Sequence, residues 1–192
     1  MRHPIYLPLS ALLLLLAGCA SVPLEPGCER FGRDGQVCLL PPSALPALDG
    51  SRLVTVTRDG QAQSFMGLLH IDDRNLRLVG LSLLGTGIFS LVYDGHDVTA
   101  QPADSELHPE RLVVMLELAV ADPGALQPRL RGLELKTGEK DGLEARDVYE
   151  HGELLAHIER SQGPLTDATL SISVPPLKLS VLMKPMPAST SP

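Results

Sequence analysis

Short apolar stretches separated by polar turn signals run along most of the chain, and this pattern predicts a mainly β protein. Turn signals such as Asp59-Gly60 and Asp94-Gly95 stand between the apolar stretches, as in the hairpins of an antiparallel meander. Strands are therefore expected at residues 52–57, 63–71, 76–84 and 88–93, with another starting at Val98.

One segment, residues 108–120, breaks this pattern. Pro109 stands near its start and Asp122-Pro123-Gly124 follows its end, and these are helix start and stop signals. The segment is apolar on every side, with one face formed by Leu112, Met115, Leu116 and Ala119. We expect a helix that the rest of the fold covers; its valines would also suit a buried strand.

The C-terminal third returns to strands. Apolar and polar residues alternate over residues 153–159 and 169–174, so one face of these strands is expected to be exposed to solvent. A last apolar row covers residues 177–183, and Pro185 ends the fold before a flexible tail at 186–192.

In the middle strands both faces are apolar, and Gly80 can bend or bulge the strand that contains it. About ten strands can satisfy this pattern if they form a curved antiparallel sheet, that is, an incomplete β-barrel capped by the helix. The inner face of this sheet would then line a pocket. A sandwich or barrel with a solid core is the alternative. Candidate lipid-cavity residues, each of which could equally be plain core, are Phe65, Leu78, Leu81, Phe89, Leu91, Leu116, Ile158 and Ile172, with the helix at 112–119 as a movable lid.

The first nineteen residues indicate the compartment. An apolar run at residues 5–16 is too short to span a bilayer and suits a signal peptide, and it ends in Leu16-Ala17-Gly18-Cys19, which resembles the lipobox of bacterial lipoproteins. We expect residues 1–18 to be removed and Cys19 to carry lipid, giving three acyl chains and a stable anchor. An ordinary secretory cleavage site or a transmembrane anchor is the alternative.

The residue after Cys19 is Ala20 and not the Asp that commonly retains lipoproteins at the inner membrane. By that analogy the protein is expected at the outer membrane of a Gram-negative cell, on its periplasmic face. Cys28 and Cys38 then remain in an oxidising compartment, where a disulfide is their expected state, and no zinc-ligand spacing accompanies them. Residues 19–48 are Pro-rich and are interpreted as a tether, which leaves residues 49–185 as the folded domain.

Composition and charge further limit the classes of function that this chain can have. The chain has 192 residues, a net charge of -7, 3% aromatic residues and no Trp, which favours one domain and argues against a nucleic-acid partner. Catalytic motifs are incomplete: Gly80-Leu81-Ser82-Leu83-Leu84 lacks the second Gly of a nucleophile elbow, and the six histidines show no metal-ligand spacing. We therefore expect no enzyme activity, no cofactor and no metal.

Residues 65–85, followed by Ile88-Phe89-Ser90-Leu91-Val92-Tyr93-Asp94-Gly95, resemble an uncharacterised family of Gram-negative lipoproteins related to LolA and LolB. The resemblance implies an incomplete antiparallel barrel whose concave apolar face is capped by helices and holds acyl chains. It also implies a LolA-like periplasmic carrier as a partner, and relatives of this kind are often associated with gene clusters that make aryl polyene lipids.

Together these observations predict a non-enzymatic lipoprotein that binds an acyl chain or lipid in an apolar cavity and receives or transfers it at the outer membrane. The alternative is a structural or assembly lipoprotein that binds a periplasmic protein through an exposed sheet edge. A hydrolase that uses Ser82 is a third hypothesis.

Overall fold

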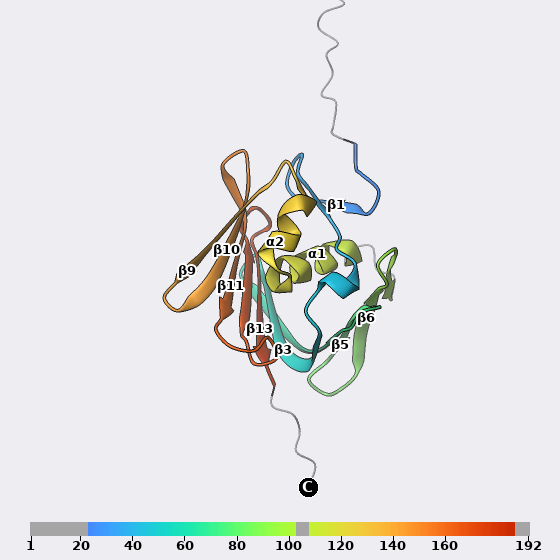
Figure 1. The fold of residues 1–192 in the computed structure, drawn as a ribbon. Coiled ribbons are helices and arrows are strands. Elements are labelled where there is room, and N and C mark those ends of the chain that lie inside the picture. The colour runs from blue at the N-terminus through green and yellow to red at the C-terminus, as the bar shows by residue number, and fades with distance from the viewer. Residues whose placement is uncertain (1–22, 103–107, 187–192) are drawn as a thin grey trace, which may run out of the picture.

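The computed structural model describes residues 23–102 and 108–186. Its main feature is a ten-stranded antiparallel sheet that curves around two helices without closing into a barrel (Figure 1). This is the mainly β, curved-sheet architecture expected from the sequence. The strands, in their order across the sheet, are β7 (Val98–Gln101), β6 (Gly87–Tyr93), β5 (Leu76–Leu81), β4 (Gln61–Ile71), β3 (Leu48–Arg58), β13 (Leu179–Pro185), β12 (Leu170–Val174), β11 (Glu153–Ser161), β10 (Leu143–Glu150) and β9 (Glu134–Lys140).

The strand order consists of two meanders, β3 to β7 and β9 to β13, joined where β13 pairs with β3. Three of the hairpins close through two-residue turns in which both residues have positive φ: Asp59-Gly60, Asp141-Gly142 and His151-Gly152. This geometry matches the right-handed twist of the flanking strands, and Gly adopts it without steric cost. Local turn chemistry therefore sets the register of these pairs.

The register brings four connections to the same end of the sheet. The β3–β4, β5–β6, β10–β11 and β12–β13 turns all lie there, because each strand runs antiparallel to its neighbours. We call this the hairpin end. The final strand, β13, runs away from it and finishes at Pro185, at the opposite end.

Helix α1 (Pro109–Val120) lies within the concave face of the sheet, followed by the short α2 (Pro123–Leu126) (Figure 1). Seven of its residues are buried, including Val113 and Val114, which are fully inaccessible. The sheet and the N-terminal segment cover the helix together, which suits its largely apolar surface. Among the described residues, no helix combines the length and the apolar character needed to cross a membrane.

The segment expected to be a tether is largely part of the folded body. β1 (Cys28–Arg30), β2 (Gln36–Cys38) and β8 (Leu130–Arg131) form a second, three-stranded sheet, and a 3-10 turn follows at Pro42–Ala44. Val37 and Leu40 are buried in the core, so the tether predicted over residues 19–48 is corrected. Its prolines shape a loop that packs against α1, and apolar burial outweighs the extended preference that proline confers.

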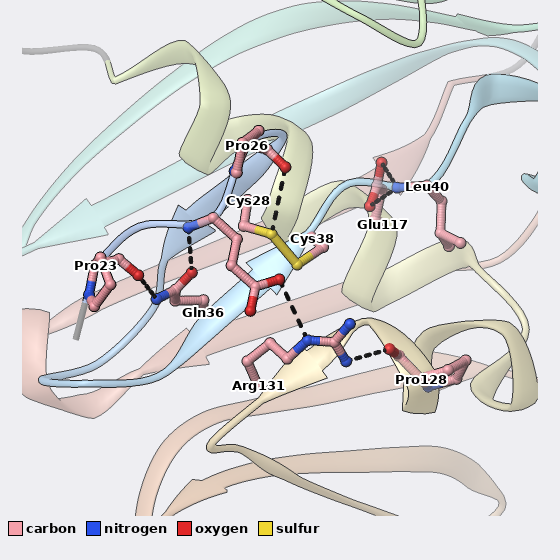
Figure 2. Close-up of a disulfide and its surroundings, with 10 residues drawn as sticks. Pro23, Pro26, Cys28, Gln36, Cys38, Leu40, Glu117, Pro128 and Arg131 are labelled. Carbon is pink, nitrogen blue, oxygen red and sulfur yellow. Dashed lines mark hydrogen bonds and ion pairs between the residues drawn. A yellow bond between two sulfur atoms is a disulfide. The ribbon is translucent and has the colours of Figure 1, made fainter.

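Even the first described residues are held to this sheet (Figure 2). The buried Gln36 side chain donates from Nε2 to the Pro23 carbonyl at 2.8 Å and accepts from the Glu25 N–H at 2.9 Å. Arg131 pairs with the Glu25 carboxylate at 3.6 Å. The core residues lie between Cys28 and Met183, so a chain that begins at Ala20 retains all of them.

Candidate functional site

A cavity of about 770 Å³ opens at the hairpin end of the sheet. This volume lies within the range of sites that bind small molecules, roughly 300–1,000 Å³. Five parts of the chain surround it: the β1–β2 turn, the end of β3, the start of α1, the β10–β11 turn and the β12–β13 connection, which includes the 3-10 turn Pro175–Leu177.

The floor of the cavity is apolar. Leu112 and Met115 on α1 face Val174 and Leu179 of the sheet across it, and Leu155 completes the set. Leu155 reaches the cavity through a β-bulge, because Ala156 pairs with Val148 and Leu154 with Tyr149, leaving Leu155 unpaired between them. The simple alternation expected over residues 153–159 is therefore wrong at this point, where the bulge turns Leu155 inward.

The β1–β2 turn forms one wall and is held by a carboxylate. Glu150 accepts hydrogen bonds from the backbone N–H groups of Arg33, Asp34 and Gly35 at 2.8, 2.7 and 2.6 Å. Burial works to raise the pKa of Glu150, but these three donors outweigh it and hold the pKa below its ordinary value. Gly32 has a φ of 98°, and a Cβ there would meet Leu155, so only glycine fits this close approach.

A disulfide cross-links the β1–β2 hairpin that forms this wall (Figure 2). Cys28 and Cys38 face each other across β1 and β2 and are joined by a 2.02 Å S–S bond, the pairing expected from the sequence. Cys19, the predicted lipidation site, and the signal peptide at residues 1–18 lie outside the described residues, as does most of the tail predicted at 186–192.

The mouth of the cavity is basic. Arg30, Arg33, Arg58 and Arg111 all line it, together with His108 at the start of α1. Arg111 pairs with Glu29 at 3.3 Å, and Arg30 donates to the Arg33 carbonyl at 3.1 Å. A cavity with an apolar floor and a cationic mouth can bury a chain and pair with an anion at its entrance.

The predicted cavity residues do not line this cavity. Leu78, Leu91, Leu116, Ile158 and Ile172 are buried in the packed core between α1 and the sheet. The remaining three, Phe65, Phe89 and Leu81, are only partly buried on neighbouring strands, and the two Phe rings meet edge to face with centroids 5.6 Å apart. The interior expected to be hollow is filled because α1 occupies it.

Helix α1 is accordingly core and not a movable lid. Arg146 on β10 is buried and donates from Nη1 to the carbonyls of Leu118 and Ala121 at the end of the helix, at 2.9 and 2.7 Å. Glu117, also buried, accepts from the Leu40 N–H. The helix is thus tied to β10 and to the N-terminal segment, and only its first two turns face the cavity.

Other polar groups have structural roles. Ser82 Oγ accepts from the N–H groups of Leu84 and Thr86 and so shapes the β5–β6 turn. The side chains of Asp34, Glu150 and His151 approach closely enough to hold a metal ion, but Glu150 is already engaged by three backbone donors.

Sequence reasoning misses most of the residues that surround this cavity: it places Leu112 and Met115 in the predicted lid at 112–119 without naming them as lining residues, and it gives no role to Leu155 or the mouth arginines. The run Arg30-Phe31-Gly32-Arg33 was the one local signal available, since it places two cations around an apolar residue in a Gly-rich turn.

Comparison with protein-family models shows to which family this chain belongs. A family model described as "Protein of unknown function (DUF3261)" matches residues 51–181. The chain belongs to the DUF3261 family. The match covers most of the large sheet, both helices and β8, and it starts after the β1–β2 hairpin. A comparison with curated proteins finds no match.

Proposed function

We propose that this DUF3261 protein is a non-enzymatic lipid-binding lipoprotein of the outer membrane, which holds an acyl chain in the cavity at the hairpin end and receives it from, or passes it to, a periplasmic carrier. The observation that carries the proposal is the 770 Å³ cavity with its floor of Leu112, Met115 and Leu155. Burying a chain on such a floor is favourable by about 25 cal/mol per Å² of apolar surface. Binding and release of this kind need no covalent chemistry.

A distant relationship to LolA and LolB is part of the proposal. An open, curved antiparallel sheet around helices supports it, as do the residues over 65–95 that resemble that family. In this chain α1 fills the centre of the concavity, so the acyl chain would enter at one end and not along the whole concave face.

The position of the N-terminal segment supports a role directly at the membrane surface. Pro23 is held by Gln36, and it stands four residues after Cys19, the proposed lipid anchor. Four residues span at most about 14 Å when fully extended. A lipid anchor on Cys19 would therefore keep the domain close against the bilayer instead of on a long tether.

The tip of the β5–β6 hairpin offers an apolar contact with that membrane. Leu83 and Leu84 are 64% and 95% exposed, and Ile88 beside them is 46% exposed. Exposed apolar side chains gathered at a loop are typical of sites that bind membranes or proteins. The tip and the cavity lie at the same end of the sheet, so one orientation presents both to the bilayer.

Native mass spectrometry of the Ala20 to Pro192 chain, exported to the periplasm, tests the proposal. We expect a stoichiometric lipid to co-purify and the emptied protein to bind a fluorescent fatty acid such as parinaric acid. Leu112→Trp should fill the floor and weaken this binding by about tenfold, whereas Leu68→Trp, on an exposed strand position outside the cavity, should not.

An empty protein that also refuses added fatty acid would contradict the proposal. It would favour the alternative, an assembly lipoprotein that binds a periplasmic protein by adding a strand to β9, whose residues Glu134–Lys140 are almost all exposed at the sheet edge. Equal binding by the Leu112 and Leu68 variants would place the ligand outside this cavity.

A further inference from the structure

Three separate parts of the chain bring arginines to the mouth of the cavity. Arg30 and Arg33 belong to the β1–β2 hairpin and its turn, Arg58 ends β3, and Arg111 lies in the first turn of α1. The tertiary fold assembles this cluster, since no local run of basic residues contains it. The chain as a whole is acidic, with a net charge of -7, so the basic mouth is a local exception to its overall balance.

Two of these cations are available to a ligand. The side chains of Arg33 and Arg58 are exposed, and within the part of the chain that the structure describes they form no hydrogen bond or ion pair. Arg111 is paired with Glu29 at 3.3 Å. The nearby Lys178 is paired with Asp59 at 3.7 Å.

The carboxylates at the mouth do not neutralise it. Glu150 and Glu153 both line the cavity beside the four arginines, and Glu29 pairs with Arg111, so a net positive charge of +1 remains at the mouth. Both Glu150 oxygens already accept backbone N–H groups of the β1–β2 turn. Glu153 is exposed at the start of β11.

We propose that the ligand is an anionic amphiphile, whose acyl chain lies on the Leu112, Met115 and Leu155 floor and whose phosphate or carboxylate group pairs with Arg33 and Arg58. This inference rests on the proposed function and adds the class of headgroup. Guanidinium groups present forked donors that match the oxygens of phosphate and carboxylate. A neutral lipid would leave both cations without a partner, and a free anion would leave the apolar floor uncovered.

The test measures the affinity of the Ala20 to Pro192 chain for hexadecyl phosphate, hexadecanol and inorganic phosphate. We expect hexadecyl phosphate to bind about tenfold more tightly than hexadecanol at low salt. Arg33→Gln with Arg58→Gln should weaken the binding of hexadecyl phosphate and so reduce this preference to less than about threefold. Arg74→Gln with Arg77→Gln removes the same charge from exposed positions outside the cavity and should keep the preference.

Equal affinity of the unaltered protein for the two amphiphiles would overturn the headgroup assignment while leaving the proposed function intact. Inorganic phosphate that binds as tightly as hexadecyl phosphate would overturn it too, since the site would then be one for a free anion. If the control pair lost the preference as fully as the mouth pair, overall charge and not this site would be the cause. Failure of every amphiphile to bind would instead refute the proposed function.

Discussion

The carboxylate of Glu117, in the last turn of α1, lies against the backbone N–H of Leu40, with its two oxygens 3.1 and 3.2 Å from the nitrogen (Figure 2). This contact joins the central helix to the N-terminal segment that precedes the large sheet. Burial raises the pKa of Glu117 to about 8, and the Leu40 N–H and the charge of Arg129 only partly oppose this effect.

The raised pKa predicts a pH-dependent stability. Between the pKa of an unfolded Glu, about 4.3, and that of the folded protein, the native state binds the extra proton, so stability falls as pH rises from about 4.5 to about 8. Glu117→Gln removes this titration. We expect it to gain about 1–3 kcal/mol relative to the unaltered protein between pH 5 and pH 8.5, measured by urea unfolding.

The matched control for this experiment is Glu134→Gln, which changes a carboxylate that is 61% exposed on β9. Parallel stability profiles for the unaltered protein and the Glu117 variant across this pH range would show that the buried carboxyl does not titrate as argued.

Arg146 holds the end of α1 against β10, so removing its guanidinium should loosen the helix. Arg146→Met keeps most of the aliphatic chain but leaves the carbonyls of Leu118 and Ala121 without their buried donor. We expect a loss of about 1–3 kcal/mol in the free energy of unfolding. Arg77→Met, at an exposed position on β5, should change stability little, and an equal loss in both variants would contradict the assigned role.

The disulfide should support both stability and the cavity wall. Cys28→Ser with Cys38→Ser opens a loop whose ends are 10 residues apart, which predicts a loss of about 2–3 kcal/mol in urea unfolding. Because β1 and β2 carry the turn that lines the cavity, fatty-acid affinity should also fall. Unchanged affinity at a temperature where the variant remains folded would show that the wall is held by Glu150 alone.

The β5–β6 tip predicts a separable effect on membranes. Leu84→Asp places a charge where the proposal requires an apolar contact, so binding of the Ala20 to Pro192 chain to phospholipid vesicles should weaken by about tenfold or more. Parinaric acid affinity should stay the same, because Leu84 does not line the cavity. Leu68→Asp, at an exposed leucine away from the tip, is the control, and equal losses in the two variants would refute a specific role for the tip.

Several local features of this fold could be predicted from the residues alone. The Asp59-Gly60 turn, the strands around it and the helix after Pro109 are where the sequence places them. Gly80 was expected to bend or bulge its strand, and the register shifts beside it, where the Phe89 ring covers the glycine. The apolar run over residues 76–84 does not show where β5 ends, because Leu83 and Leu84 are apolar and yet exposed.

The sequence by itself determined the first meander, the last strands near residues 153–183 and the largely apolar helix, because turn residues, alternation and helical spacing act between near neighbours. The tertiary structure decided the rest. Whether the concavity is hollow depends on how deeply α1 packs into it, and the cavity floor depends on a bulge that turns Leu155 inward. The basic mouth brings together Arg33, from the β1–β2 turn, and Arg58, from the end of β3. Residues so far apart in the chain meet only when the large sheet curves around its helix and packs against the N-terminal hairpin.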